Sequence, residues 1–146
     1  MKTISVLLIS LFSISFVTWQ TDFGKAKEVA KEKHQLILLN FSGSDWCVPC
    51  IRMRKEIFDD ATFSAMADAE LVMVNADFPR MKKNQLPKVI KKQNDSLADK
   101  YNPEGKFPFT LLLDANGKII HTWDGLPEKD GPKFAKEVKS ICDANK

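Results

Sequence analysis

The sequence predicts an α/β domain in which a central mixed sheet is flanked by helices. Residues 36–41 form a near-continuous apolar run, typical of a strand buried on both faces. Segments with helical periodicity alternate with such runs along the chain. Asn116-Gly117 is a strong hairpin signal, which makes the last two strands antiparallel. The predicted order is helix, strand, helix, strand, helix, strand, strand, helix.

The N-terminal segment, residues 1–19, is interpreted as a signal peptide. Lys2 supplies the positive charge, and residues 4–17 are apolar apart from serines. As a helix this run spans about 21 Å, short of the ~30 Å hydrocarbon core of a bilayer. We therefore expect a mature domain at 20–146, in the periplasm or outside the cell, with no stable membrane insertion after cleavage. An uncleaved anchor is the alternative.

The first half of the mature chain holds two predicted helices on either side of a strand. Ala26, Val29 and Ala30 recur among charged residues, with Asp22 as the expected N-cap. A loop at 42–45 separates the apolar strand from the next helix. The predicted elements are a helix at 22–34, a strand at 36–41, a helix from 49 to 59–60, and a short helix through 66 capped by residue 60 or 62.

The second half contains the remaining strands and two helices. Its closing helix carries Phe134, Val138 and Ile141 at helical spacing. The predicted elements are a strand at 71–76, a helix at 88–101, strands at 109–113 and 118–123, and a helix from 128.

Composition describes a single globular domain of 146 residues with a net charge of +3. That charge does not indicate nucleic-acid binding, and we expect a monomer.

Six basic residues and no acid lie between Arg80 and Lys92, which favours either a solvated helix face or a surface for an acidic partner. Cys142 is either an isolated thiol or the site of an intermolecular disulfide.

Cys47 and Cys50 form a Cys-x-x-Cys pair, which fits a redox dithiol, half of a zinc site, or a structural disulfide. Zinc needs four ligands, and Cys142, His34 and His121 have no recognisable spacing, so we expect no metal. Closing so short a loop removes little unfolded-state entropy, which disfavours a purely structural disulfide. The redox interpretation is therefore the strongest, and it needs no cofactor because the dithiol carries the electrons.

The position of the pair favours redox chemistry, because a buried strand ends and a helix begins there. Helix N-terminal N–H groups stabilise a thiolate, and Pro49 fits the first turn, where its missing N–H costs nothing. We expect Cys47 to be the exposed nucleophile and Cys50 the shielded resolving thiol.

Residues 41–58, FSGSDWCVPCIRMRKEIF, resemble the active-site segment of the thioredoxin-fold family. They are most similar to exported thioredoxin-like proteins related to the C-terminal domain of the DsbD reductant. Phe107-Pro108, just before an apolar strand, matches the family's cis-proline landmark. The resemblance covers about 22–141 and implies a thioredoxin fold. It also implies a substrate-binding surface at Trp46, Phe107 and Pro108.

Two positions depart from the family pattern. Thioredoxin has a buried aspartate on the strand before the motif, and this chain has Asn40 and Phe41 there. Asp45 is the alternative acid for proton transfer, although we expect it to be exposed. Pro108 is followed by Phe109 and only then by Thr110, where the family commonly has Pro-Thr.

These observations together predict a thiol–disulfide oxidoreductase that reduces disulfides of exported proteins. The motif keeps thioredoxin's proline and has no histidine between its cysteines, which favours a reductant over an oxidant. Its electrons would come from a membrane donor. The alternatives are a redox-inactive thioredoxin-like binding or chaperone module, and a thiol reductase of cytochrome maturation.

Overall fold

The computed structural model describes residues 17–145, so most of the predicted signal peptide lies outside the described residues. A five-stranded sheet has the order β1-β3-β2-β4-β5. Its parallel part consists of β1 (Trp19–Gln20), β3 (Leu71–Asp77) and β2 (Leu36–Ser42). β4 (Phe109–Leu113) runs antiparallel to β2, and β5 (Ile119–Asp124) runs antiparallel to β4. The mixed sheet predicted from the sequence is confirmed.

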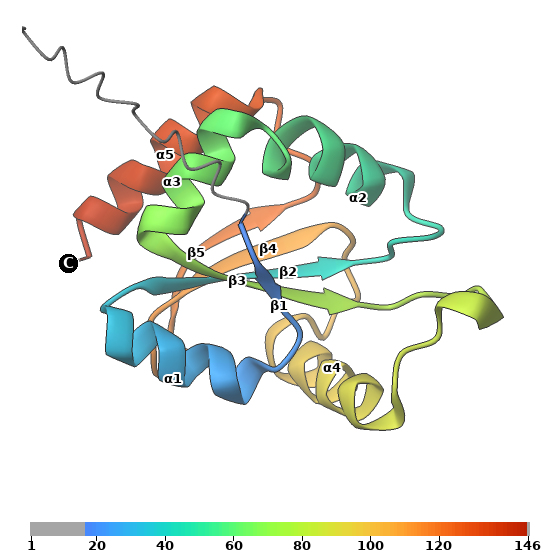
Figure 1. Cartoon of the computed structure of the whole chain (residues 1–146). Helices are drawn as coiled ribbons and strands as arrows, with labels where there is room; N and C mark the ends of the chain where they lie inside the picture. The colour runs from blue at the N-terminus through green and yellow to red at the C-terminus, as the bar shows by residue number, and fades with distance from the viewer. Residues whose placement is uncertain (1–16, 146) are drawn as a thin grey trace, which may run out of the picture.

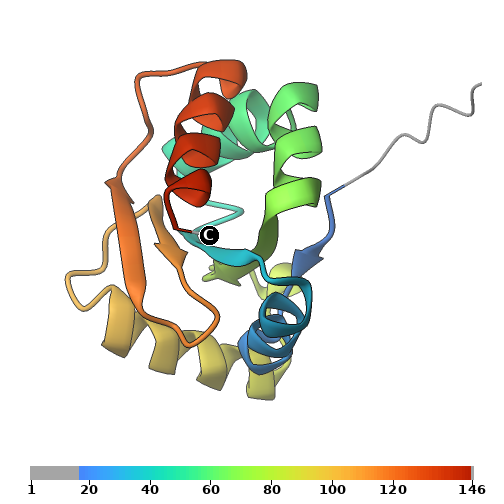
Figure 2. The same cartoon turned by 90° about the vertical axis from the view of Figure 1, so that its left-hand side faces the viewer.

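The helices form a layer on each face of this sheet, as the two views show (Figures 1 and 2). α2, α3 and α5 cover one face, whereas α1 and α4 cover the other. The helical elements are α1 (Phe23–Lys33), α2 (Val48–Met53), η1 (Arg54–Phe58), α3 (Ala61–Glu70), η2 (Lys82–Asn84), α4 (Lys88–Tyr101) and α5 (Gly131–Asp143).

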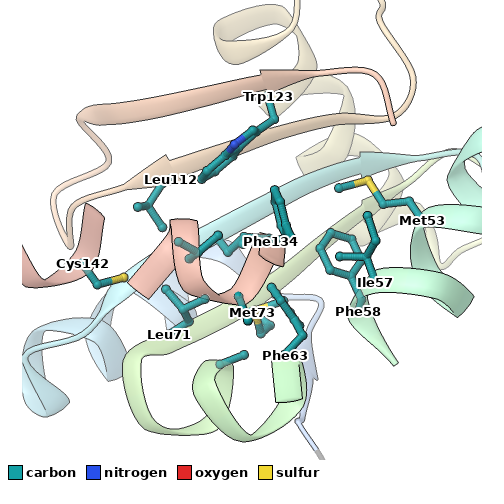
Figure 3. Close-up of a cluster of buried hydrophobic side chains, with 14 residues drawn as sticks. Met53, Ile57, Phe58, Phe63, Leu71, Met73, Leu112, Trp123, Phe134 and Cys142 are labelled. Atoms are coloured by element: carbon teal, nitrogen blue, oxygen red, sulfur yellow. The ribbon is translucent and has the colours of Figure 1, made fainter. Parts of the chain in front are cut away.

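Apolar side chains fill the space between each helical layer and the sheet. Figure 3 shows the cluster beneath α3 and α5, where the Phe63 and Phe134 rings stack with centroids 5.8 Å apart. Trp123 from β5 meets Phe134 edge-on at 5.2 Å. A second cluster, which includes Phe41 and Tyr101, lies under α1 and α4. Burial on both faces explains why β2 is apolar along its whole length.

Side-chain caps set where α1 and α3 begin. The Asp22 carboxylate accepts a hydrogen bond from the Lys25 backbone N–H, as expected for an N-cap. Asp60 accepts from two N–H groups at the start of α3, so it, not Thr62, is the cap. α3 also continues to Glu70, beyond the predicted end at 66, because buried Ala67 extends its packed face.

Two local features differ from the predicted elements. The helix after the dithiol is not α-helical throughout, since Arg54–Phe58 forms a π-helical turn. Trp19 and Gln20 form the edge strand β1, so the predicted domain boundary between residues 19 and 20 falls within a strand. Among residues 17–145, no helix has the length and apolar character needed to cross a membrane.

Candidate active site

β2 and the loop after it carry the cysteine pair to one edge of the sheet. Ser42 ends β2, and the Cys47 backbone N–H donates to the Gly43 carbonyl at 2.9 Å. Ser44 donates to the Asp77 carboxylate from both its backbone N–H, at 2.9 Å, and its hydroxyl, at 2.6 Å. Because Asp77 ends β3, the loop is held at two neighbouring strand ends.

Cys47 and Cys50 form a disulfide at the start of α2, with their Cα atoms 5.2 Å apart. Cys47 is the N-cap, and its sulfur accepts a hydrogen bond from the Cys50 backbone N–H at 3.3 Å. Pro49 lies in the first turn, as predicted. An N–H group aimed at this sulfur, together with the helix N-terminus, stabilises negative charge on it.

Exposure does not distinguish the two cysteines in this oxidised form, contrary to the expectation of an exposed Cys47. Each is 4% exposed. The reason is that the disulfide draws the Cys47 sulfur toward Cys50, with Val48 and Pro49 exposed around it. What does separate them is position, because Cys47 lies outside the helix whereas Cys50 lines a cleft on the inner side of α2.

The cleft behind Cys50 has a volume of about 250 Å³, and two asparagines contribute to its wall. Asn40, 5% exposed, and Asn75 line it from adjacent positions of β2 and β3. The Asn40 amide donates to the Thr110 hydroxyl at 2.9 Å. An uncharged, hydrogen-bonded amide therefore stands where the family resemblance implies a carboxylic acid.

Asp45, the alternative acid, has its carboxylate engaged elsewhere. It accepts hydrogen bonds from the backbone N–H groups of Arg80 and Met81 and from the Asn84 amide, each at 2.9 Å. The Arg80 N–H, with further help from Asn84 and Met81, lowers the pKa of Asp45 below its ordinary value. Asp45 is thus an anchor for residues 80–84, not a proton acceptor at the dithiol.

Trp46 lies between the dithiol loop and three neighbouring groups. Its indole N–H donates to the Phe78 carbonyl at 2.7 Å. The Phe107 ring meets it edge-on at 5.3 Å, and the Arg80 guanidinium lies 3.7 Å above its centroid. A Cβ on Gly43 would come within 2.3 Å of the indole, so the glycine makes room for it. Trp46 is partly buried, and it is held from several sides.

The Phe107–Pro108 peptide bond is cis, as the resemblance implied. Phe41 and Phe109 are register partners in β2 and β4. Pro108 therefore lies beside the end of β2, at the edge from which the dithiol loop leaves. The Phe107–Trp46 ring contact joins this proline segment to the residue before Cys47.

Phe78 and Arg80 complete the surroundings of Trp46, and neither was predicted from the sequence to belong to the site. Both follow β3, more than thirty residues after the motif, and no local pattern links them to it. Arg52 and Arg54, which are closer in sequence, pair with Glu56 and Asp59. Arg54 also lines the cleft that reaches Cys50.

The third cysteine lies apart from this site. Cys142 is 1% exposed and packs in the cluster beneath α5, so in the folded chain it is not available for an intermolecular disulfide. In the part of the chain that the structure describes, no group of three or more His, Cys, Asp or Glu residues is placed to hold a metal ion.

The chain has a mixed sheet between two helical layers. It also has a Cys-x-x-Cys disulfide at a helix N-terminus and a cis-proline at the same edge of the sheet. Together these features define a class of proteins. That class is the thiol–disulfide oxidoreductases of thioredoxin fold.

Comparison with known proteins places the chain within that class. Residues 18–115 match the family described as Thioredoxin-like, and the chain belongs to this family. The disulfide bond reductase DsbH of Chlamydia pneumoniae is 35% identical over 122 residues, which span 84% of this chain and 70% of that protein.

Solved structures resemble the whole domain. A DsbH oxidoreductase superposes with a TM-score of 0.81 at 30% identity, covering 97% of this chain and 95% of that one. The oxidised C-terminal domain of DsbD from Neisseria meningitidis gives a TM-score of 0.55 at 16% identity, covering 81% and 90%. This second likeness is one of fold.

Proposed function

We propose that this chain reduces disulfides of exported proteins, with Cys47 as the nucleophile and Cys50 as the resolving thiol. The observation that carries the proposal is the Cys47 sulfur at the N-cap of α2, 3.3 Å from the Cys50 N–H. Trp46, Phe107 and Pro108 form the adjacent substrate-binding surface. No metal or organic cofactor takes part.

The reaction begins with both cysteines reduced. The Cys47 thiolate attacks one sulfur of the substrate disulfide, forming a mixed disulfide, and the other substrate sulfur leaves as a thiolate that takes up a proton. Cys50 then loses its proton and attacks the Cys47 sulfur, so the second substrate thiol is released. Two electrons pass to the substrate, and the Cys47–Cys50 disulfide forms.

The proton of Cys50 needs an acceptor in the second step. Asn40 is not titratable, and the Asp45 carboxylate is bound to residues 80–84. The cleft of about 250 Å³ that reaches Cys50 gives solvent access on its inner side. We infer that the proton leaves to water in this cleft, with Asn40 and Asn75 as hydrogen-bonding groups on its wall.

Reduction is favoured over oxidation by two observations. The motif Cys47-Val48-Pro49-Cys50 has no histidine to stabilise the thiolate further, and a relative that is 35% identical over 122 residues is a disulfide bond reductase. The apolar segment at residues 4–17 supports export to the periplasm or outside the cell. A membrane electron donor would reduce the Cys47–Cys50 disulfide of the oxidised enzyme back to the dithiol.

A trapping experiment tests the assignment of the two cysteines. Cys50→Ala, in a Cys142→Ala background, should accumulate mixed disulfides between Cys47 and substrate proteins, because the resolving thiol is gone. Cys47→Ala in the same background is the matched control and should form none. Absence of mixed disulfides in the first variant would contradict the proposal and favour a redox-inactive binding module.

A further inference from the structure

Residues Arg80–Lys92, called here the basic segment, begin immediately beside the dithiol. Three hydrogen bonds to the Asp45 carboxylate hold residues 80–84, and the Arg80 guanidinium covers the Trp46 ring. Figure 1 shows η2 of this segment and the loop before α2 leaving the sheet on the same side. Asp45 and Trp46 directly precede Cys47, so the basic segment flanks the reactive pair.

The charges of the basic segment are almost all uncompensated. Its six cations are Arg80, Lys82, Lys83, Lys88, Lys91 and Lys92, and no acid lies between them. All six are exposed. Only Lys91 forms an ion pair with another residue among 17–145, namely Asp95, at 3.0 Å.

The carboxylates of Asp45 and Asp77, which lie beside the start of the segment, form hydrogen bonds and no ion pair with its lysines. Asp45 accepts two backbone N–H groups of the segment itself, and Asp77 holds Ser44. Asp45 therefore fixes the position of the segment while most of the lysine charge remains directed to solvent. Met81, within the segment, is 48% exposed and adds apolar contact area.

We propose that the basic segment binds an acidic stretch of the substrate protein next to its disulfide, so that the enzyme prefers disulfides flanked by Asp and Glu. The inference rests on the proposed reductase function and adds its substrate class. Charge complementarity carries it, since a patch of one sign raises the rate of encounter with an oppositely charged partner.

Single-turnover reduction of three model peptide disulfides by the reduced full-length protein tests this proposal. The peptides are alike except for flanking residues, which are Asp and Glu, Asn and Gln, or Lys. The acidic peptide should be reduced about tenfold faster than the amide peptide at low ionic strength. The difference should shrink as salt approaches 0.1–0.2 M, where charges are screened beyond about 10 Å.

Lys82→Ala/Lys83→Ala should remove most of the preference for the acidic peptide while leaving the rate with the amide peptide unchanged. The matched control is Lys31→Ala/Lys33→Ala, which removes the same charge from the end of α1, before β2 begins and hence at the opposite sheet edge. That control should retain the preference. Neither pair contacts the cysteines.

The possible results separate this proposal from the proposed function. If all three peptides are reduced at similar rates, the acidic preference is overturned. If the two double variants behave alike, the assignment of that preference to the basic segment is overturned. The reductase function stands in both cases. If no peptide is reduced, the reductase function fails first.

Discussion

Asp45 and Trp46, the two residues before Cys47, each fix a different part of the surface around it. The Asp45 carboxylate binds the backbone at Arg80 and Met81, and the Trp46 indole binds the Phe78 carbonyl. One loop therefore positions both Cys47 and the segment after β3. The sequence motif alone marks Trp46, but these partners are visible only in the fold.

The Asp45 anchor should persist to low pH. Its pKa lies below the ordinary value of 3.8, first because of the Arg80 N–H, so the charged form is favoured in the folded state. The anchor is thus fully present above pH 3.8 and is lost only as pH falls through the lower folded value. NMR titration of the Arg80 and Met81 amide shifts measures this, with Asp45→Asn as the non-titrating control. A midpoint above 3.8 would contradict the account.

Gly43→Ala should displace Trp46, because the new Cβ would lie 2.3–2.6 Å from the indole atoms Cε2, Cζ2 and Nε1. Loss of the indole–Phe78 hydrogen bond should slow reduction of peptide disulfides and shift tryptophan fluorescence to longer wavelength. In a Trp46→Ala background the same substitution should have little further effect on rate, as a double-mutant cycle would report. Additive effects in the cycle would show that Gly43 acts by another route.

At the scale of elements, the N-terminal ends of α3 and α5 lie in close contact. Asp60 caps α3, and Gly131 is the first residue of α5. A Cβ on Gly131 would lie 2.4 Å from the Asp60 Cβ and 2.6 Å from its Cγ. The absence of a side chain at 131 therefore sets how closely the two helix starts approach.

Gly131→Ala should lower the free energy of unfolding by about 1–3 kcal/mol, the usual cost of overpacking. Alanine in place of glycine within a helix ordinarily raises stability by about 1 kcal/mol, so the sign itself is informative. Urea denaturation measures the change. Gly24→Ala is the control, since its Cβ would meet only the Asp22 carboxylate oxygen, at 3.3 Å. A Gly131→Ala protein as stable as wild type would refute the packing argument.

The sequence predicted most elements because their signals are local. The apolar run of β2, the Asn-Gly turn and the Asp22 cap all act within a few residues. β1 escaped prediction because a two-residue strand has no periodicity, and Trp19 continues the apolar leader. The π-helical turn was missed because its residues have ordinary helical spacing, with adjacent Ile57 and Phe58 both buried.

The residues of the candidate site likewise fall into those with a local sequence signal and those without one. Cys47, Cys50, Trp46, Pro49 and Pro108 are recognisable from motifs, and the cis bond before Pro108 followed from the resemblance. The contacts of Asp45 with residues 80–84 could not be predicted, because they join residues more than thirty positions apart. The sequence therefore left both interpretations of the basic segment open.

For the whole molecule, the two helical layers and the mixed sheet bring the dithiol, the cis-proline and the basic segment to one edge. The domain thus provides a redox pair, the proposed substrate-binding surface beside it, and a group of exposed positive charges. The direction of electron flow depends on how strongly the fold stabilises the reduced pair, and about 30 mV corresponds to about 1.4 kcal/mol.

The reduction potential of the Cys47–Cys50 pair tests the central claim most directly. It is measured by equilibrating the protein with defined thiol–disulfide buffers and quantifying its free thiols, in a Cys142→Ala background. A reductase should give a value near that of thioredoxin, about −270 mV. A value near about −120 mV, typical of a strong oxidant of the same fold, would contradict the assignment.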